Sequence, residues 1–302
     1  MSHALDTVAV PVASIGTVVG NAANVLAAIL FLAVIALGLW VIFGMMRVIN
    51  MAHGELFMLG AFTAWWFESH GLGFWASLVV APLLVGALGV AIERTVIRPL
   101  YGRGDLSTLL ATAGISIILQ RVISLWFGAR AQSVTAPVSG HFSLLGQPFV
   151  IYKVIAMAFA AAAIVGTFAL FRFTAFGLRA RATINNPHMA EVFGINAARM
   201  NMASFGLGAA LAGFAGVLIA PLISVVPTMG LDFVVRSFLV VIVGGTGGLV
   251  GVLGGSTLIG GADSGLTLAF SGTVADIIVL VLAMLLVLVR PRGIFARDDA
   301  RE

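Results

Sequence analysis

The chain has 302 residues, of which 61% are hydrophobic and only 9% are charged. So apolar a composition excludes an ordinary soluble domain and is typical of a polytopic membrane protein. The net charge of +4 is explained by basic residues in loops and indicates no nucleic-acid partner, and the absence of cysteine excludes disulfides and thiol chemistry.

We predict an all-α transmembrane bundle of eight or nine spans that forms a single domain over residues 1–302. No charged residue lies between Asp6 and Arg47, and this run exceeds the roughly 20 apolar residues that cross a bilayer. Two expected spans, 54–69 and 255–271, are short enough to be broken or re-entrant. The complete set is 20–45, 54–69, 73–96, 106–128, 149–171, 201–222, 233–252, 255–271 and 274–290.

The basic residues are distributed unevenly over the loops between these spans. Because lysine and arginine collect in cytoplasmic loops, their positions predict an external N-terminus and a cytoplasmic C-terminus. Arg130, Lys153 and Arg236 fall at the outer boundary. The residues that fall on the cytoplasmic side include Arg47, Arg94, Arg98, Arg103, Arg172, Arg179, Arg181, Arg199 and Arg290.

Residues 47–60, RVINMAHGELFMLG, place Asn50, His53 and Glu55 at membrane depth beside Gly54. Polar groups there are costly and face a cavity or protein, and a broken backbone is tolerated only where it lines one of these. The segment is either a discontinuous helix beside a translocation pathway or a structural hydrogen-bond cluster. A metal site is not expected, because His53 and Glu55 at i, i+2 do not share a helix face.

The sequence offers little support for an enzyme. Residues 114–117 fit the loose GxSx pattern of an intramembrane serine protease around Ser116. That pattern is a weak signal in a glycine-rich chain, and only His53 is available as a remote partner. The external loop 129–148 is too short for a folded ligand-binding domain, so another polypeptide is expected to capture any solute.

Charged residues also occur within or near the expected spans. Arg121, Asp263 and Asp276 must face protein, water or one another, because exposure to lipid is costly. Helix-to-helix ion pairing or snorkelling to the membrane interface is favoured over a proton relay, since three scattered charges are few for a coupling pathway. Asp232 and Arg236, at i, i+4, are expected to form a salt bridge at a helix start rather than a ligand site.

The most polar segment is 176–200, which leaves one span, turns at 185–187 and forms a short amphipathic helix over 188–193 before a break at Gly194. A short helix between two spans on the basic side is a docking element. Because the chain has no soluble domain of its own, an external machine is expected to act on the membrane part here.

Residues 244–261, GGTGGLVGVLGGSTLIGG, are dense in glycine but lack the GK[ST] ending of a phosphate-binding loop. Close helix packing is the expected role of these small residues, with a chain break near 244–248. The same interpretation covers Gly206, Gly208, Gly213 and Gly216.

Together these segments resemble a known family. The motifs RVINMAHGELFMLGAF, ERTVIRPL, GLRARATINNPHMAEVFGIN, GLGAALAGFAGVL, VVIVGGTGGLVGVLGG and RPRGIF look like the LivH class of inner-membrane permeases in branched-chain amino acid ABC importers. The similarity runs from about Leu37 to Phe295. Parts of these motifs are equally similar to permeases for urea or short amides.

The resemblance implies a non-enzymatic permease of the bacterial inner membrane that works by alternating access. Its implied partners are a second related permease, two cytoplasmic subunits that bind ATP-Mg, a periplasmic solute-binding protein and membrane lipid, with no cofactor in this chain. An ion-coupled secondary transporter or channel is the alternative from another class. The residues implied in ATPase coupling are Met189, Ala190, Glu191, Val192, Phe193 and Gly194. The residues expected along the translocation pathway are Asn50, His53, Gly54, Glu55, Gly244, Gly245, Gly247 and Gly248.

Overall fold

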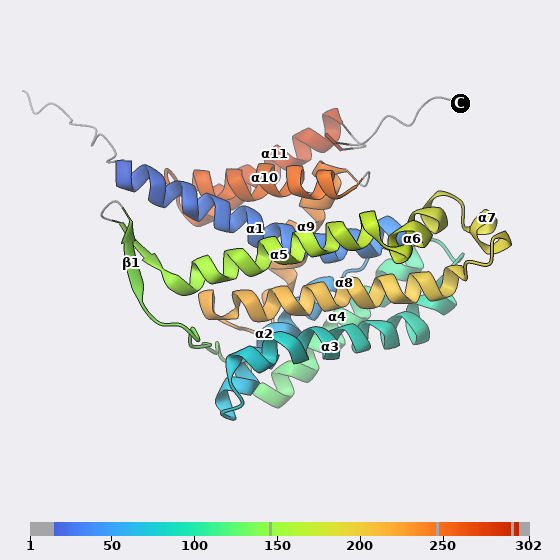
Figure 1. The fold of residues 1–302 in the computed structure, drawn as a ribbon, viewed down its shortest axis with the longest axis horizontal. Helices are drawn as coiled ribbons and strands as arrows, with labels where there is room; N and C mark the ends of the chain where they lie inside the picture. Colours follow the sequence, from blue (N-terminus) through green and yellow to red (C-terminus); the bar gives the residue numbers. More distant parts are fainter. Residues whose placement is uncertain (1–14, 145–146, 246–247, 291–292, 296–302) are drawn as a thin grey trace, which may run out of the picture.

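The computed structural model describes residues 15–144, 147–245, 248–290 and 293–295 of an elongated helical bundle (Figure 1). Within this part of the chain, seven helices are long and apolar enough to cross a membrane. They are α1 (Ile15–Met46), α3 (Phe74–Ile92), α4 (Asp105–Phe127), α5 (Ile151–Phe173), α8 (Ala197–Ile219), α10 (Leu249–Leu266) and α11 (Gly272–Val289). The polytopic helical bundle predicted from the sequence is therefore confirmed.

Two further apolar helices, α2 (His53–Ser69) and α9 (Met229–Gly244), are shorter and lie inside the bundle. Ten of the 17 residues of α2 are buried, and α2 packs against α8, α3 and α9. Short helical turns η1 (Glu93–Ile97), η2 (Arg98–Leu100) and η3 (Ala220–Leu222) extend α3 and α8.

The two ends of the bundle differ. At one end, a hairpin of β1 (His141–Leu144) and β2 (Gln147–Val150) joins α4 to α5, and at the other end α6 (Ala175–Asn185) and α7 (Pro187–Val192) protrude (Figure 1). We call these the hairpin end and the α7 end. The hairpin is a departure from the expected all-α fold. A backbone bridge from Gln132 to Val225 fastens this connection to the loop after α8.

The expected span over 233–252 is wrong, because a break divides it. Helix α9 ends at Gly244, and residues 249–252 already belong to α10. Gly245 and Gly248 flank the break with φ angles of 86° and 149°, which residues with a side chain rarely adopt. The break itself falls where the glycine pattern predicts it. The last five residues of the expected span 255–271 lie beyond α10.

The bundle is held by close backbone contacts at glycines, as the small-residue pattern predicts. A β-carbon added at several of these positions would collide with the backbone of a neighbouring helix. In lipid, such contacts replace the hydrophobic driving force that acts in water. The contacts that bring α2 into the core are Gly54 on Gly230 of α9, Gly60 on Gly213 of α8, and Gly216 of α8 on Phe57.

We expect Gly60→Ala to destabilise the bundle by about 1–3 kcal/mol, the usual cost of overpacking, because its methyl group would meet the Gly213 carbonyl. Gly114→Ala is the matched control, since nothing lies within 4 Å of that position on α4. The measurement is the melting midpoint of each detergent-solubilised variant. Equal midpoints for the two variants would contradict the packing account.

Candidate functional site

The first candidate site is the start of α2, which lies inside the bundle rather than at its edge. Arg47 adopts a left-handed φ of 52° where α1 ends, and the chain turns back so that α2 begins at His53. The His53 Nε2 atom lies 3.0 Å from the Ile35 carbonyl oxygen, in the interior of α1. Asn50, His53 and Glu55 are all fully buried.

The irregular backbone before α2 is satisfied by two side chains. The Ala52 amide donates to Asn50 Oδ1 over 3.1 Å, and the Met51 amide donates to Thr112 Oγ1 on α4 over 3.1 Å. The Thr112 hydroxyl also lies 3.2 Å from the Ile49 carbonyl oxygen. Because backbone that leaves a helix inside the membrane must be satisfied by protein, these contacts fix where α2 begins.

Glu55 connects α2 with the two helices on either side. Its Oε1 atom accepts hydrogen bonds from Gln120 Nε2 at 2.7 Å and Ser116 Oγ at 3.0 Å. Its Oε2 atom has no partner among the described residues and faces Gly230, where an added β-carbon would come within 2.6 Å of it. Only a glycine at 230 therefore leaves room for the carboxylate between α4 and α9.

Helix α4 presents a polar stripe to this site. Its members are spaced by four residues, so they lie on one face of the helix: Thr108, Thr112, Ser116 and Gln120. Sequence reasoning assigned no role to Thr112 or Gln120 and considered Ser116 only as a nucleophile. The signal that could have found them is the i, i+4 repeat of polar side chains in an otherwise apolar span.

His53 and Glu55 point to different helices, one toward α1 and the other toward α4. The described residues include no group of histidine, cysteine and acidic side chains that could hold a metal. In this conformation Asn50, His53 and Glu55 are hydrogen-bonded to their neighbours and shielded from solvent.

The glycines expected to share the pathway lie elsewhere. Gly244, Gly245 and Gly248 are at the opposite end of α9 from Gly230, about 21 Å away at 1.5 Å per helical residue. There the C-terminal segment docks, with the Ile294 amide donating to the Val243 carbonyl over 2.8 Å. Gly247 lies outside the described residues. The structure therefore places the two groups at the two ends of one helix rather than in one constellation.

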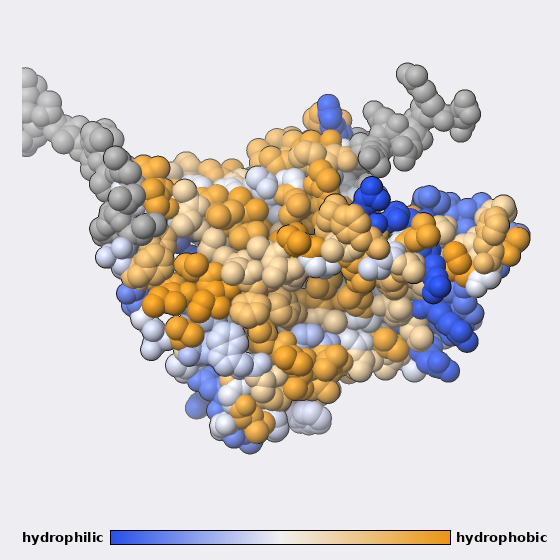
Figure 2. Space-filling model, viewed as in Figure 1, coloured by the Kyte–Doolittle hydropathy of each residue, from blue (hydrophilic) through white to orange (hydrophobic). Residues whose placement is uncertain are grey.

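The second candidate site is the tip formed by α7, which projects beyond the ends of the spans (Figure 1). Met189, Val192 and Phe193 are 49%, 68% and 78% exposed, while Ala190 is buried beneath them. An apolar patch on a polar surround is visible there in Figure 2. Such a patch outside the apolar belt marks an interaction surface.

Local hydrogen bonds fix the backbone at both ends of α7. Asn186 caps the start of α7 by accepting from the Met189 amide over 3.0 Å. After α7 the Ile195 amide donates to the Ala190 carbonyl over 2.9 Å, and Gly194 takes a left-handed φ of 79°. Glu191 and Gly194 are exposed beside the apolar patch.

A cavity of about 530 Å³ connects the base of the tip with the segment that leads into α2. Its lining includes Arg47, Val48 and Pro187. On its wall Tyr101 donates to Glu93 Oε1 over 2.8 Å. Burial and then the neighbouring Glu93 raise the pKa of the Tyr101 phenol, so this donor stays protonated. The cavity therefore lies between the two candidate sites.

Apolar spans, a polar helix start within the bundle and a protruding tip define a multi-pass membrane protein. Residues 21–289 match the family described as the branched-chain amino acid transport system permease component, and the chain belongs to this family. The resemblance seen in the sequence is thus confirmed.

Named relatives cover nearly the whole chain. The high-affinity branched-chain amino acid permease protein LivH of Escherichia coli K12 is 29% identical over 89% of this chain and 92% of its own length. LivH of Salmonella typhimurium is 28% identical with the same coverage, and BraD of Pseudomonas aeruginosa is 28% identical over 89% and 93%. No solved structure matches the chain.

We expect the double variant Ser116→Ala, Gln120→Leu to lose roughly 2–4 kcal/mol of stability, because it leaves the buried Glu55 carboxylate without donors. Adding Glu55→Leu should restore much of this loss by removing the stranded polar group. Melting midpoints in detergent check both expectations. An unchanged midpoint in the double variant would show that these bonds do not hold α4 to α2.

Proposed function

We propose that this permease subunit imports branched-chain amino acids across the bacterial inner membrane, driven by ATP hydrolysis on separate subunits. The observation that carries the proposal is the exposed apolar patch of α7 on a chain whose glycine-rich segment lacks a nucleotide-binding signature. The printed names of the relatives supply the substrate class.

The proposed topology has nine membrane-embedded segments, counting the two short helices α2 and α9. An odd number puts the two ends of the chain on opposite sides of the membrane. In the proposed orientation the N-terminus is outside, and the C-terminus and the α7 end are cytoplasmic. The arginines support it, because Arg47, Arg98, Arg103, Arg179 and Arg181 lie near the α7 end.

The α7 tip is the proposed contact with an ATP-binding subunit. Met189, Val192 and Phe193 would be buried in a cleft of that subunit, and each large apolar side chain contributes about 1.5–3 kcal/mol when fully buried. Glu191 supplies charge that fixes the register of docking. Ala190 and Gly194 shape the tip from beneath and behind, so the coupling residues act as one rigid unit.

Movement of the tip would pass into the spans through α6. The Arg181 guanidinium donates to the Phe171 carbonyl, and Gly177 packs on the Phe171 backbone, so α6 is fixed to the end of α5. Rigid helices in contact through small residues shift as units, which is the motion that alternating access requires.

In this scheme the pathway lies beside the start of α2. A shift of α4 would uncover Glu55, which bonds Ser116 and Gln120 of that helix. Asn50, His53 and Gly54 lie beside Glu55 and are also closed in the present conformation. The hydrogen bonds between Glu55 and α4 can be replaced by hydrogen bonds to water at a small cost in free energy. An apolar contact at this place would offer no polar groups to a solute. Gly244, Gly245 and Gly248 are the proposed hinge at the far end of α9.

The proposed assembly contains a second related permease, two ATPases that bind ATP-Mg and a periplasmic binding protein, all within membrane lipid. The binding protein would select the solute, so a urea or short-amide system is a possible outcome of transport assays on the same assembly. An ion-coupled mechanism is disfavoured because Asp263 and Asp276 are both ion-paired, which leaves them poorly suited to a proton relay.

The test uses the complete complex in proteoliposomes supplied with ATP and liganded binding protein. We expect uptake of L-leucine, and expect Val192→Asp, Phe193→Asp to abolish both uptake and solute-stimulated ATP hydrolysis, because two carboxylates cannot enter an apolar cleft. Uptake of urea instead of L-leucine would move the substrate assignment to the amide class.

Leu106→Asp is the matched control, since Leu106 is 67% exposed at the same end of the bundle but lies outside the tip. It should retain stimulated hydrolysis. Normal hydrolysis in the tip variant, with the complex intact, would contradict the coupling assignment.

A further inference from the structure

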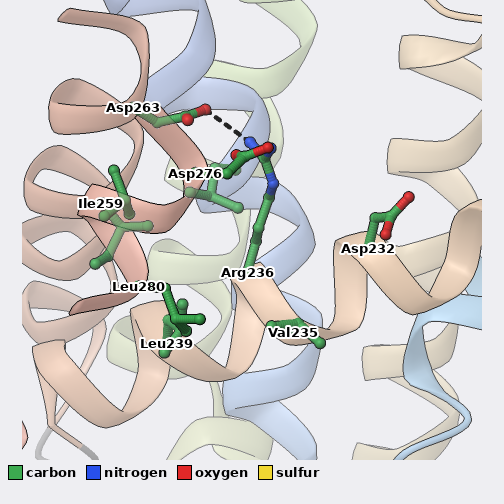
Figure 3. Close-up of a pocket in the computed structure, with 10 residues that line it drawn as sticks. Asp232, Val235, Arg236, Leu239, Ile259, Asp263, Asp276 and Leu280 are labelled. Atoms are coloured by element: carbon green, nitrogen blue, oxygen red, sulfur yellow. Dashed lines mark hydrogen bonds and ion pairs between the residues drawn. The ribbon is translucent and has the colours of Figure 1, made fainter. Parts of the chain in front are cut away.

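Three charged side chains from three different helices meet near the hairpin end. Arg236 of α9 donates to Asp263 of α10 over 2.7 Å and to Asp276 of α11 over 2.5 Å (Figure 3). The predicted helix-to-helix ion pairing is confirmed for Asp263 and for Asp276, each of which pairs with Arg236. The predicted bridge between Asp232 and Arg236 is wrong. Asp232 is directed away from the guanidinium, and Arg121 is exposed on α4.

The trio lines a cavity of about 390 Å³. That volume lies within the range of small-molecule sites, about 300–1,000 Å³. The remaining walls are mostly aliphatic, with Leu32 from α1, Leu239 from α9, Ile259 from α10 and Val279 and Leu280 from α11. The cavity thus combines both signs of charge with a branched aliphatic surface.

The three charged side chains are partly exposed, and each is ion-paired. The side chains of Arg236, Asp263 and Asp276 are 39%, 20% and 52% exposed. Charges at membrane depth face water or protein because lipid is too costly. This side of α9, α10 and α11 is therefore directed toward an aqueous space or a partner subunit. Partly exposed ion pairs contribute little net stability, so one of them can be exchanged for a ligand contact.

We propose that this cavity is a contact site for a zwitterionic aliphatic amino acid entering the pathway from outside; the inference rests on the proposed import function. The solute carboxylate takes one side of the Arg236 fork in place of Asp276, the more exposed partner. The released Asp276 carboxylate receives the solute ammonium group, and Asp263 keeps the guanidinium in place.

The geometry of the guanidinium suits this exchange. Arginine binds planar carboxylates through paired donors, and each of its two terminal nitrogens here already holds one carboxylate. The solute side chain then contacts the aliphatic walls, which favours branched chains over polar ones. Because Asp276 leaves Arg236, the exchange also loosens α11 from α9 while solute is present.

The first test uses the natural absence of cysteine from this chain. Leu280→Cys places a single thiol in the cavity wall, where it is 49% exposed, and a small thiol reagent reports its access in the assembled complex without ATP or binding protein. L-leucine at about three times its dissociation constant should slow the modification about fourfold, by one-site occupancy.

Two analogues of L-leucine each lack one charge. We expect 4-methylpentanoate, without the ammonium group, and 3-methylbutylamine, without the carboxylate, to protect the thiol far less than L-leucine at the same concentration. Equal protection by all three compounds would show that only the apolar walls bind them and would contradict recognition of the two charges. No protection by L-leucine would overturn the proposal.

A neutral variant separates solute recognition from simple fastening of the helices. Replacing the whole trio by Arg236→Met, Asp263→Asn and Asp276→Asn removes the guanidinium together with both of its carboxylate partners, and such replacements are often tolerated by the fold. Asp232, which also lines the cavity, keeps its charge in this variant as in the parent. We expect uptake to fall roughly tenfold or more, the cost of losing charge-assisted bonds, with the complex still assembled and protection by L-leucine lost.

Normal uptake or persisting protection in the neutral variant would contradict the site. If the triple variant does not assemble, the single variant Asp276→Asn tests the proposal, because it removes only the exchangeable partner of Arg236. It should abolish protection of the thiol by L-leucine. Thr257→Val on the exposed face of α10 is the control and should behave as the parent. Protection of the Leu280→Cys thiol by L-leucine, together with no ATP-driven uptake by the parent complex, would overturn the proposed function and leave this site standing.

Discussion

The structure depends on one constraint: polar groups at membrane depth must be satisfied by protein. Helix α2 begins within the bundle, and its start is possible only because Thr112, Ser116 and Gln120 of α4 supply the missing partners. This arrangement also explains why α4, a largely exposed span, stays attached to the bundle. The same bonds that fix α2 are the ones a moving α4 would exchange for water or solute.

Helix α9 links the parts of the protein to which we assign function. Its first turn leaves room for the Glu55 carboxylate at Gly230, and Arg236 in its middle joins α10 and α11. Its last turn, at Gly244, receives the C-terminal segment. A short helix held at both ends and crossed by an exchangeable ion pair is well placed to respond to solute on one side and to the cytoplasmic machinery on the other.

Much of the fold follows from the sequence, because long apolar runs and glycine faces are local signals. The α7 tip was predictable from Asn186, Pro187 and Gly194, which set a cap, a helix start and a stop within a few residues. The division between α9 and α10 was misplaced because hydropathy alone does not register a break flanked by Gly245 and Gly248. The partners of Glu55 and Arg236 could not be read from the chain, since they lie more than 25 residues away.

The central claim is that the α7 tip of this permease subunit contacts an ATP-binding subunit. The most direct measurement is photo-crosslinking from a benzoylphenylalanine placed at Phe193 in the intact complex, compared with one at the exposed Phe173 of α5. The account predicts a covalent product with the ATPase from position 193 and none from position 173. An intact complex that gives no ATPase product from position 193 would contradict it.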